Sequence, residues 1–327
     1  MTPIVGHAVA QARFLGALRG GSLHHAWLLT GPEGVGKASF AQAAAAHMLA
    51  LAGGGAPLGS GLDVPDDHPT RRLIEAGSHP DLRVLERLTK TGDTGQETMA
   101  RSITIDQVRS LQPMFATTPS LGPRRVVIID AIDDLERGGA NALLKNLEEP
   151  PAGTVFLLVS HAPGRLLPTI RSRCRLLRFG ALGDDQMRRI LTTALPEAGE
   201  EEIAGAARAG EGAPGRALRF AGLDIAGLDG SIGRLIGSGD PDNAERSRLA
   251  QSLSTKAAQP RYEAFLDRAP AAIAAAARVR VGGALSVALD AHRDARDLAG
   301  AATGLSLDPQ ATVFEMAGIL ARLASRA

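Results

Sequence analysis

The sequence predicts an α/β protein with a parallel sheet covered on both faces, followed by a helical region. Short apolar runs that indicate strands alternate with helical stretches over about the first 180 residues. A glycine-rich loop follows the first of these runs, and strand signals stop after residue 180. Strands separated by helices pair in parallel, because each connection must cross a face of the sheet.

Four apolar runs supply most of the strands. They span residues 27–30, 126–130, 154–160 and 174–179. Residues 81–85 are weaker in apolar content, and we predict a further strand there. Continuous apolar runs of this length are typical of strands that are buried on both faces.

Local signals mark the ends of several other elements. A short strand is predicted at 103–105, leading into Asp106 as the N-cap of a helix that ends near Pro113. Longer helices are predicted at 37–50, where apolar residues recur at intervals of four, and at 140–149. A Pro-Pro pair ends the last of these helices.

The composition excludes several functional classes. A net charge of +1 argues against a protein that coats nucleic acid through a strongly basic surface. The single cysteine, Cys174, rules out an intramolecular disulfide and a multi-thiolate zinc site, and it favours a cytoplasmic setting. No apolar run approaches the roughly 18 residues of a membrane span. A signal peptide is not expected either.

A chain of 327 residues can hold two or three domains. We predict an α/β domain over residues 1–180. A small helical domain follows over 181–240, where glycine and proline interrupt short helical stretches. A second helical, alanine-rich domain is predicted over 241–327.

The glycine-rich loop is typical of a phosphate-binding site. Gly31, Gly34 and Gly36 allow backbone N–H groups to approach an anion closely, at the start of a helix whose N-terminus is electropositive. Lys37 supplies a point charge for the outer phosphates. Nucleotide-binding loops of this kind have a Ser or Thr after the lysine to hold Mg²⁺, but here the residue is Ala38. Ser39 cannot replace it, because one helical step turns a side chain by about 100°.

A second departure lies at the end of the strand at 126–130. Asp130 matches the strand-terminal aspartate that holds Mg²⁺ in nucleoside triphosphatases. ATPases that polarise a water usually have a glutamate next to that aspartate, and this chain has Ala131. The scaffold therefore indicates a degenerate nucleotide site, and unaided hydrolysis is not expected. The sequence leaves open whether ATP or ADP still binds weakly.

Five arginines occur within residues 165–178 without an intervening acid. Such a run is commonly a solvated cationic surface, and we prefer that interpretation for Arg165 and Arg178. Arg173 differs because it lies between Ser172 and Cys174, directly before a predicted strand. A guanidinium held in this way is suited to gripping phosphate oxygens.

Other residues give weaker signals. Ser160 and His161 end a strand beside the predicted phosphate site, where a polar side chain can sense the γ-phosphate, although a solvated loop is almost as good an interpretation. Arg216 could reach a nucleotide from the second domain, although most such arginines cap helices. The Cys174 thiol has no evident base and is better explained as a small buried residue than as a nucleophile.

Four stretches together resemble the bacterial clamp-loader branch of the AAA+ proteins. They are the loop at 25–37, the strand end at 126–131, the stretch at 141–151 that ends in Leu-Glu-Glu-Pro-Pro, and Arg-Ser-Arg-Cys at 171–174. The resemblance covers about the first 180 residues. It implies a RecA-like AAA+ parallel-sheet domain, a small helical lid domain and an all-α C-terminal collar domain.

The resemblance also implies partners and roles. The partners are gamma/tau and delta subunits of the DNA polymerase III holoenzyme, with the sliding clamp and primed DNA reached through the complex. Arg173 would act in trans as an arginine finger, while Ser160 and Arg216 would be sensor-like. Many relatives carry a four-cysteine zinc module after the first helix. Residues 51–80 contain no cysteine, so no zinc is expected.

Two other functions remain open from the sequence. The chain could be an ATPase motor in its own right, although it lacks the hydroxyl and the acid that such a motor uses. It could also be a DNA-binding adaptor that uses the arginine run through phosphate contacts, and its affinity would then fall steeply with salt. The near-neutral charge makes the adaptor the least favoured of the three.

Overall fold

The computed structural model describes residues 4–54, 58–91, 97–305 and 307–324. The chain forms two compact units. The first comprises Met1–Pro196 and Gly210–Arg216, and the second comprises Glu197–Ala209 and Ala217–Ala327. The division of the chain at residues 180 and 240 stays a prediction beside this two-unit arrangement.

A five-stranded sheet forms the centre of the first unit. Its strands, from one edge to the other, are β2 (Leu82–Glu86), β5 (Arg125–Asp130), β6 (Thr154–Ser160), β1 (Ala26–Thr30) and β7 (Arg175–Arg178). Every neighbouring pair is parallel, with Leu28 opposite both Leu158 and Leu176. The predicted α/β class with a parallel sheet is confirmed, and the fold is AAA+-like.

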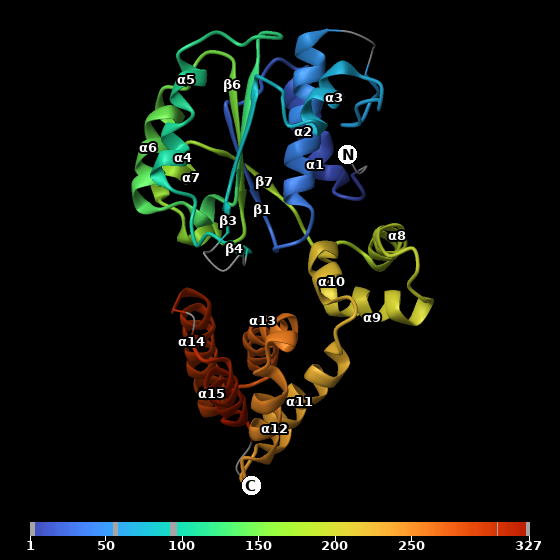
Figure 1. Ribbon diagram of the computed structural model, residues 1–327, viewed down its shortest axis with the longest axis vertical. Helices are drawn as coiled ribbons and strands as arrows, with labels where there is room; N and C mark the ends of the chain where they lie inside the picture. Colours follow the sequence, from blue (N-terminus) through green and yellow to red (C-terminus); the bar gives the residue numbers. More distant parts are fainter. Residues whose placement is uncertain (1–3, 55–57, 92–96, 306, 325–327) are drawn as a thin grey trace. The chain divides into compact units, whose positions relative to one another are not determined.

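Helices cover both faces of this sheet (Figure 1). One face carries α1 (Ala8–Arg19), α2 (Lys37–Gly53) and α3 (Pro69–Glu75); the other carries α4 (Ile105–Arg109), α5 (Gln112–Phe115), α6 (Arg137–Glu148) and α7 (Pro168–Ser172). Alternate strand residues serve the two cores, so Trp27 packs with the α1–α2 side and Leu28 with the α6–α7 side. Burial on both faces explains the uninterrupted apolar runs in the sequence.

The segment between β2 and β5 differs from the prediction. Residues 103–105 form no strand of the main sheet; Ile103 makes only an isolated bridge to Leu135. Asp106 is not the N-cap of the next helix. Thr104 is, because its side chain accepts from the backbone N–H of Gln107 while the Gln107 side chain accepts from the backbone N–H of Thr104. The segment also contains a short antiparallel hairpin of β3 (Thr89–Thr91) and β4 (Glu97–Met99).

The remaining α-helices among the described residues are α8 (Asp184–Ala194), which lies in the first unit, and seven more, which build most of the second unit. These seven are α9 (Glu200–Gly210), α10 (Pro214–Phe220), α11 (Ile225–Ser238), α12 (Ala244–Leu253), α13 (Gln259–Ala277), α14 (Gly282–Leu305) and α15 (Pro309–Ala321). Among the described residues no strand follows β7, as predicted. Phe265, Ile273 and Met316 are fully buried in a core that belongs to the second unit alone.

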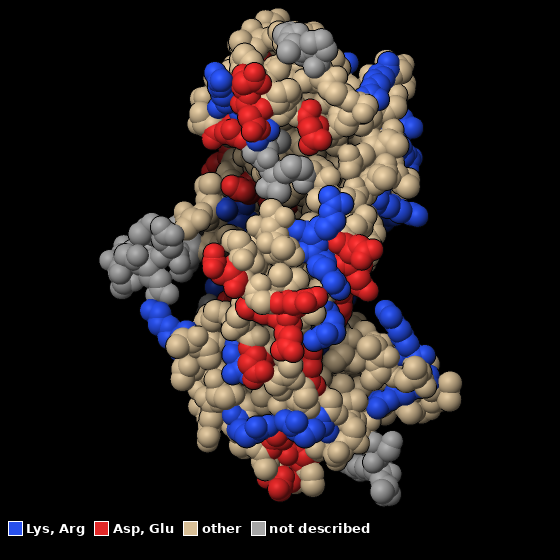
Figure 2. Space-filling model, turned by 90° about the vertical axis from the view of Figure 1, so that its right-hand side faces the viewer, with Lys and Arg blue, Asp and Glu red and all other residues tan. Residues whose placement is uncertain are grey.

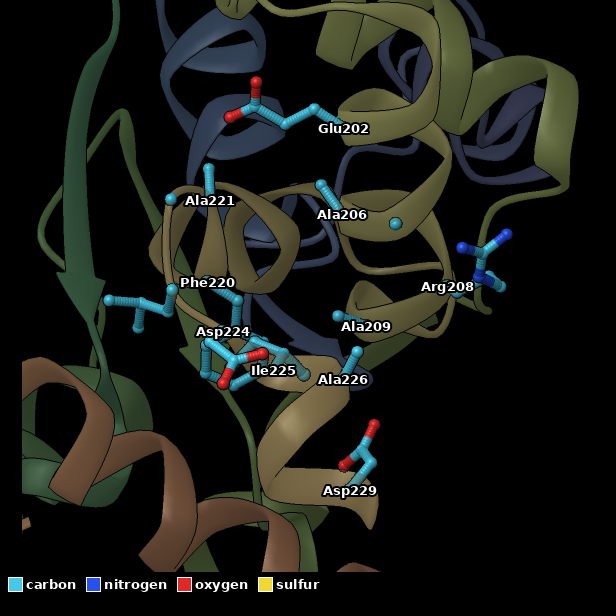
Figure 3. Close-up of a pocket in the computed structure, with 13 residues that line it drawn as sticks. Glu202, Ala206, Arg208, Ala209, Phe220, Ala221, Asp224, Ile225, Ala226 and Asp229 are labelled. Atoms are coloured by element: carbon cyan, nitrogen blue, oxygen red, sulfur yellow. The ribbon is translucent and has the colours of Figure 1, made fainter. Parts of the chain in front are cut away.

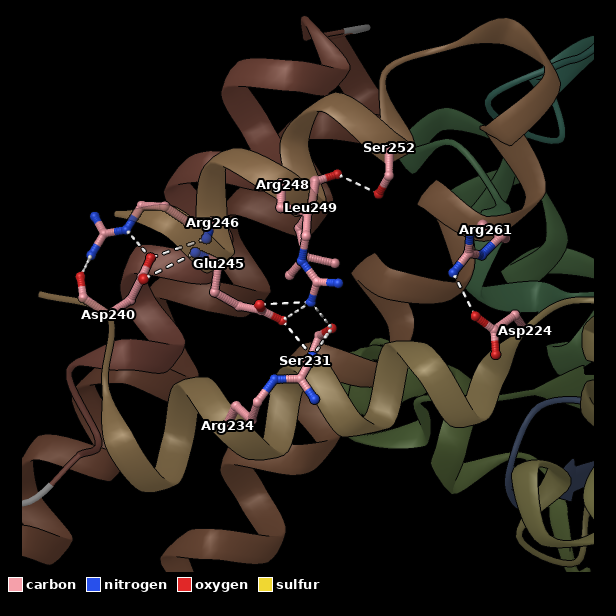
Figure 4. Close-up of polar contacts among 10 residues, drawn as sticks. All are labelled: Asp224, Ser231, Arg234, Asp240, Glu245, Arg246, Arg248, Leu249, Ser252 and Arg261. Carbon is pink, nitrogen blue, oxygen red and sulfur yellow. Dashed lines mark hydrogen bonds and ion pairs between the residues drawn. The ribbon is translucent and has the colours of Figure 1, made fainter. Parts of the chain in front are cut away.

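Ion pairs tie the helices of the second unit together at its surface (Figure 4). Glu245 on α12 accepts from Arg234 on α11 and from Arg248. These hydrogen bonds outweigh the effect of burial and lower the pKa of the Glu245 carboxyl to about 2. Asp240, which precedes α12, accepts from Arg246 in the same way.

The second unit also has a cavity of about 390 Å³ between α9 and the start of α11 (Figure 3). Its lining includes Phe220, Asp224 and Asp229. Arg268 donates to both carboxylate oxygens of Asp229, and Arg261 donates to Asp224. Arginines from α13 therefore already neutralise these two acids.

Within the described ranges, we find no helix whose length and hydropathy would let it cross a membrane.

Candidate functional site

The glycine-rich loop connects β1 to α2 and requires glycine at its turning points. Gly31, Gly34 and Gly36 have φ values of +152°, +74° and +107°. A Cβ on Gly31 would lie 2.2 Å from the carbonyl oxygen of Phe179, and one on Gly34 would lie 2.6 Å from the backbone nitrogen of Arg216. The loop therefore packs closely against its neighbours.

Lys37 is the first residue of α2 and points back into this loop. Its Nζ donates to the carbonyl oxygens of Gly31 at 2.7 Å and Pro32 at 2.6 Å. The side chain is buried, with only 2% of the residue exposed. Burial lowers the pKa of Lys37 to about 8, although the charges of Glu33 and Asp130 oppose this shift. The ammonium is thus hydrogen-bonded to backbone carbonyl groups of the loop that precedes α2.

The groups around Lys37 differ from the usual magnesium-binding set at position 38. Ala38 offers no oxygen, and Ser39 is exposed one residue further along α2. Asp130 ends β5 and is half-buried, and this burial raises the pKa of its carboxyl. Ala131 follows, 3% exposed, without a carboxylate. The donor set that holds Mg²⁺ in nucleoside triphosphatases is therefore incomplete in this chain.

Ser160, the predicted sensor, is occupied by a contact within the protein. It ends β6 opposite Thr30 of β1 and is fully buried. Its Oγ donates to Asp133 at 3.0 Å, and Asp133 also accepts from the backbone N–H groups of His161 and Ala162. The sequence prediction assigned no role to Asp133. The available signal was its place just after the strand-terminal aspartate.

Arg216 lies beside the loop, and its role toward a nucleotide stays a prediction. Its guanidinium is 3.3 Å from Glu211, and its side chain is 17% exposed. The preceding residue, Gly215, donates its backbone N–H to the carbonyl oxygen of Gly34 at 2.8 Å. The start of α10 therefore contacts the glycine-rich loop directly.

His7 is another neighbour of the loop, and the sequence analysis did not predict it. Its Nε2 lies 2.9 Å from the carbonyl oxygen of Val35, and its ring packs edge-on against Phe179 at 4.9 Å between centroids. Burial lowers the pKa of His7, and the nearby charge of Lys37 adds to this effect. No sequence pattern distinguishes His7 from an ordinary histidine near a helix start.

Arg173 lies at the C-terminal end of α7, at the protein surface. Its Nη2 is 2.7 Å from Oε1 of Glu148, and its Nη1 donates to the carbonyl oxygen of Thr169 at 2.9 Å. The side chain remains 34% exposed. Ser172 donates to the same Thr169 carbonyl oxygen, and burial raises the pKa of the Cys174 thiol to about 12, which argues against a nucleophile.

The structure separates Arg173 from the phosphate loop of its own chain. Arg175 pairs with Trp27, so Arg173 lies near the amino end of β1, whereas the loop begins after the carboxyl end at Thr30. At about 3.3 Å per residue, β1 alone places more than 10 Å between the two ends. Lys37, Asp130, Ser160 and the backbone of Arg216 gather near the other end.

No cluster of three or more histidine, cysteine, aspartate or glutamate side chains suited to a metal ion occurs among the residues that the structure describes.

A family model described as "DNA polymerase III, delta subunit" matches residues 6–183. This match covers more than half of the chain and includes the loop, Asp130 and Arg173. The chain belongs to the clamp-loader delta-prime family of DNA polymerase III.

Proteins similar to this chain include delta' subunits and a tau subunit of DNA polymerase III. The chain is 42% identical over 150 residues to DNA polymerase III subunit delta' of Pseudomonas aeruginosa, covering 46% of this chain and 41% of that protein. It is 34% identical over 160 residues to subunit delta' of Bacillus subtilis, covering 49% and 43%. It is also 33% identical over 254 residues to subunit tau of Escherichia coli, covering 74% of this chain and 36% of tau. These matches span less than half the length of each relative.

Among solved structures, a gamma subunit-related protein from Thermotoga maritima aligns over 95% of this chain and 98% of its own, at 14% identity. The TM-score of this alignment is 0.42.

Proposed function

We propose that this chain is a non-hydrolysing subunit of a DNA polymerase III clamp loader and that it supplies Arg173 to the ATP site of a neighbouring subunit. Its partners would be gamma/tau and delta subunits, with the sliding clamp and primed DNA as the objects of the assembled complex. The observation that carries this proposal is the position of Arg173, on the surface and at the opposite end of β1 from the chain's own phosphate loop.

The state of the loop supports the non-hydrolysing part of the proposal. Position 38 lacks the hydroxyl that usually binds the metal ion, and position 131 lacks the carboxylate that usually polarises the attacking water. Lys37 donates to two backbone carbonyls of its own loop. A nucleotide would have to displace these bonds, which fits the expectation that ATP or ADP binds weakly if it binds.

The surface position of Arg173 supports action in trans. An arginine finger stabilises charge that develops on the transferred phosphoryl group, and it must reach that group from outside the site. A side chain that is one-third exposed can do this across a subunit boundary. Its distance from the loop of its own chain argues against action in cis.

The test is Arg173→Ala in the reconstituted complex. We expect ATP turnover at the neighbouring site to fall by roughly 10³-fold, the lower end of the effect of arginine fingers, while the complex still assembles. Arg165→Ala is the matched control, because Arg165 is an exposed arginine of the same cationic run. ATP turnover would be measured with primed DNA and the clamp present. Unchanged turnover in Arg173→Ala would refute the proposal.

A second candidate is an ATPase motor of the gamma/tau type. The observation that favours it is the match to subunit tau of E. coli, which covers more of this chain than the matches to delta' subunits of P. aeruginosa and B. subtilis. A motor should hydrolyse ATP when isolated, and Lys37→Ala should abolish that activity. We expect no turnover from the isolated chain, and measurable turnover would favour this candidate.

A DNA-binding adaptor is less well supported. Figure 2 shows acidic and basic side chains interspersed over the face in view. A tight, salt-sensitive complex of the isolated chain with primed DNA would support this alternative.

A further inference from the structure

Glu148 is the acidic partner of Arg173. Its Oε1 lies 2.7 Å from Nη2 of the guanidinium, while Nη1 donates to the Thr169 carbonyl oxygen at 2.9 Å. The two contacts restrain the guanidinium from two different helices, α6 and α7. A guanidinium has five N–H donors in a fixed plane, so donors remain for a third group.

The backbone that carries this pair is well anchored. Leu147 precedes Glu148 and is 1% exposed, and Ile170 of α7 is also 1% exposed. Both side chains pack in the same hydrophobic core. Glu148 is the last residue of α6, and Pro150 prevents the helix from continuing. The two ends of the ion pair therefore project from fixed positions.

The pair itself adds little to stability. The side chains of Arg173 and Glu148 are 34% and 49% exposed, and ion pairs between exposed groups are screened by water. Its effect is on the freedom of Arg173, because a long unrestrained arginine samples many rotamers. A group held in one orientation loses less freedom when it meets its target.

We propose that Glu148 is a positioning residue that orients the Arg173 guanidinium for the ATP site of the neighbouring subunit. This inference rests on the proposed function of Arg173. Glu148 does not contact the nucleotide in this scheme. It acts through Arg173 by restricting the directions in which the remaining donors point.

The first test measures ATP turnover by the reconstituted complex. For Glu148→Ala we expect kcat to fall roughly 10-fold with KM for ATP unchanged, because misorientation affects the transition state more than nucleotide binding. Glu148→Gln retains an acceptor and should lose less. Glu149→Ala is the matched control, since Glu149 is the adjacent exposed acid. An unchanged or increased kcat in Glu148→Ala would overturn the inference.

A double-mutant cycle separates this inference from the proposed function. If Glu148 acts only through Arg173, Glu148→Ala has no further effect in the Arg173→Ala background. If Arg173→Ala alone leaves turnover unchanged, the proposed function fails. If Arg173→Ala lowers turnover while Glu148→Ala does not, the proposed function stands and the positioning role is wrong. An additive loss would also refute the positioning role.

A measurement on the isolated chain tests the restraint without any partner. The Nε–Hε signal of Arg173 can be assigned in a ¹⁵N NMR spectrum by its disappearance in Arg173→Ala. We expect its order parameter to drop in Glu148→Ala and to be unchanged in Glu149→Ala. An equally mobile Arg173 in the parent chain and in Glu148→Ala would contradict the proposal.

Discussion

At the scale of single residues, Lys37 is a buried lysine whose ammonium contacts only the loop of its own chain in the bonds described. A buried ammonium is costly unless hydrogen bonds satisfy its donors. Two of those donors reach carbonyl oxygens of the loop, at 2.7 and 2.6 Å. The lysine therefore stabilises the bend of the loop, and desolvation lowers its pKa from 10.5 to about 8.

This shift predicts a pH dependence of stability. Between pH 8 and 10.5 the unfolded chain holds the Lys37 proton while the folded chain releases it, so the free energy of unfolding rises with pH across this window. Relative to Lys37→Met, the parent chain should gain up to about 3 kcal/mol over the window. Urea unfolding at several pH values measures the difference. A constant difference between the two proteins would show that the ammonium is not desolvated.

At the scale of elements, the close approach of the phosphate loop to the start of α10 depends on two glycines. Gly34 has a positive φ of +74°, and a Cβ there would lie 2.6 Å from the backbone nitrogen of Arg216. A Cβ on Gly215 would lie 3.0 Å from Cα of Gly34. Backbone meets backbone at this contact, so neither side can yield by changing a rotamer.

Substitution of Gly34 should therefore cost more than backbone strain alone. Gly21 is the matched control, because its φ is +67° and nothing lies within 4 Å of its Cβ position. Gly21→Ala should destabilise the first unit by about 1 kcal/mol, and Gly34→Ala by about 1–3 kcal/mol more because of the added clash. Denaturant midpoints followed by Trp27 fluorescence measure both. Equal losses would mean that α10 moves away from the loop without cost.

At the scale of the whole molecule, the two units have separate hydrophobic cores. The sheet of the first unit packs its buried side chains on two faces, and the helices of the second unit pack around Phe265 and Met316. Trp27, the only tryptophan, is buried in the first unit, and Tyr262, the only tyrosine, is buried in the second. Each unit thus has its own spectroscopic probe.

Core truncations should then act on one unit at a time. Phe265→Ala should destabilise the second unit by about 3–5 kcal/mol and lower its thermal midpoint, while the transition reported by Trp27 stays in place. Phe156 lies in β6 of the first unit and is also fully buried. Phe156→Ala should lower the thermal midpoint of the first unit, which Trp27 reports, and leave that of the second unit in place. Calorimetry together with Trp27 fluorescence separates the two transitions. One shared transition that moves in both variants would contradict independent cores.

Much of the first unit was predictable because its signals are local. Four apolar runs predicted four of the strands, because strands that are buried on both faces consist of apolar residues. The glycines of the loop predicted its turn, because positive φ angles favour glycine. Two departures from the nucleotide-site pattern, Ala38 and Ala131, were likewise visible as residue types in a row. The N-cap at Thr104 was missed because Thr104 and Asp106, two residues apart, are both good N-cap residues, and only the backbone geometry distinguishes them.

By itself, the sequence determined the α/β class, the glycine-rich loop, the absence of a hydroxyl at position 38 and of a carboxylate at position 131, and the presence of an arginine framed by small residues. Only the tertiary structure decided which side chains meet. The bond from Ser160 to Asp133, the pair of Arg173 with Glu148, and the contact of Gly34 with Gly215 all join separate elements. Such contacts depend on how helices, strands and loops pack against one another. The order of residues along the chain does not show which residues that are far apart in sequence come into contact.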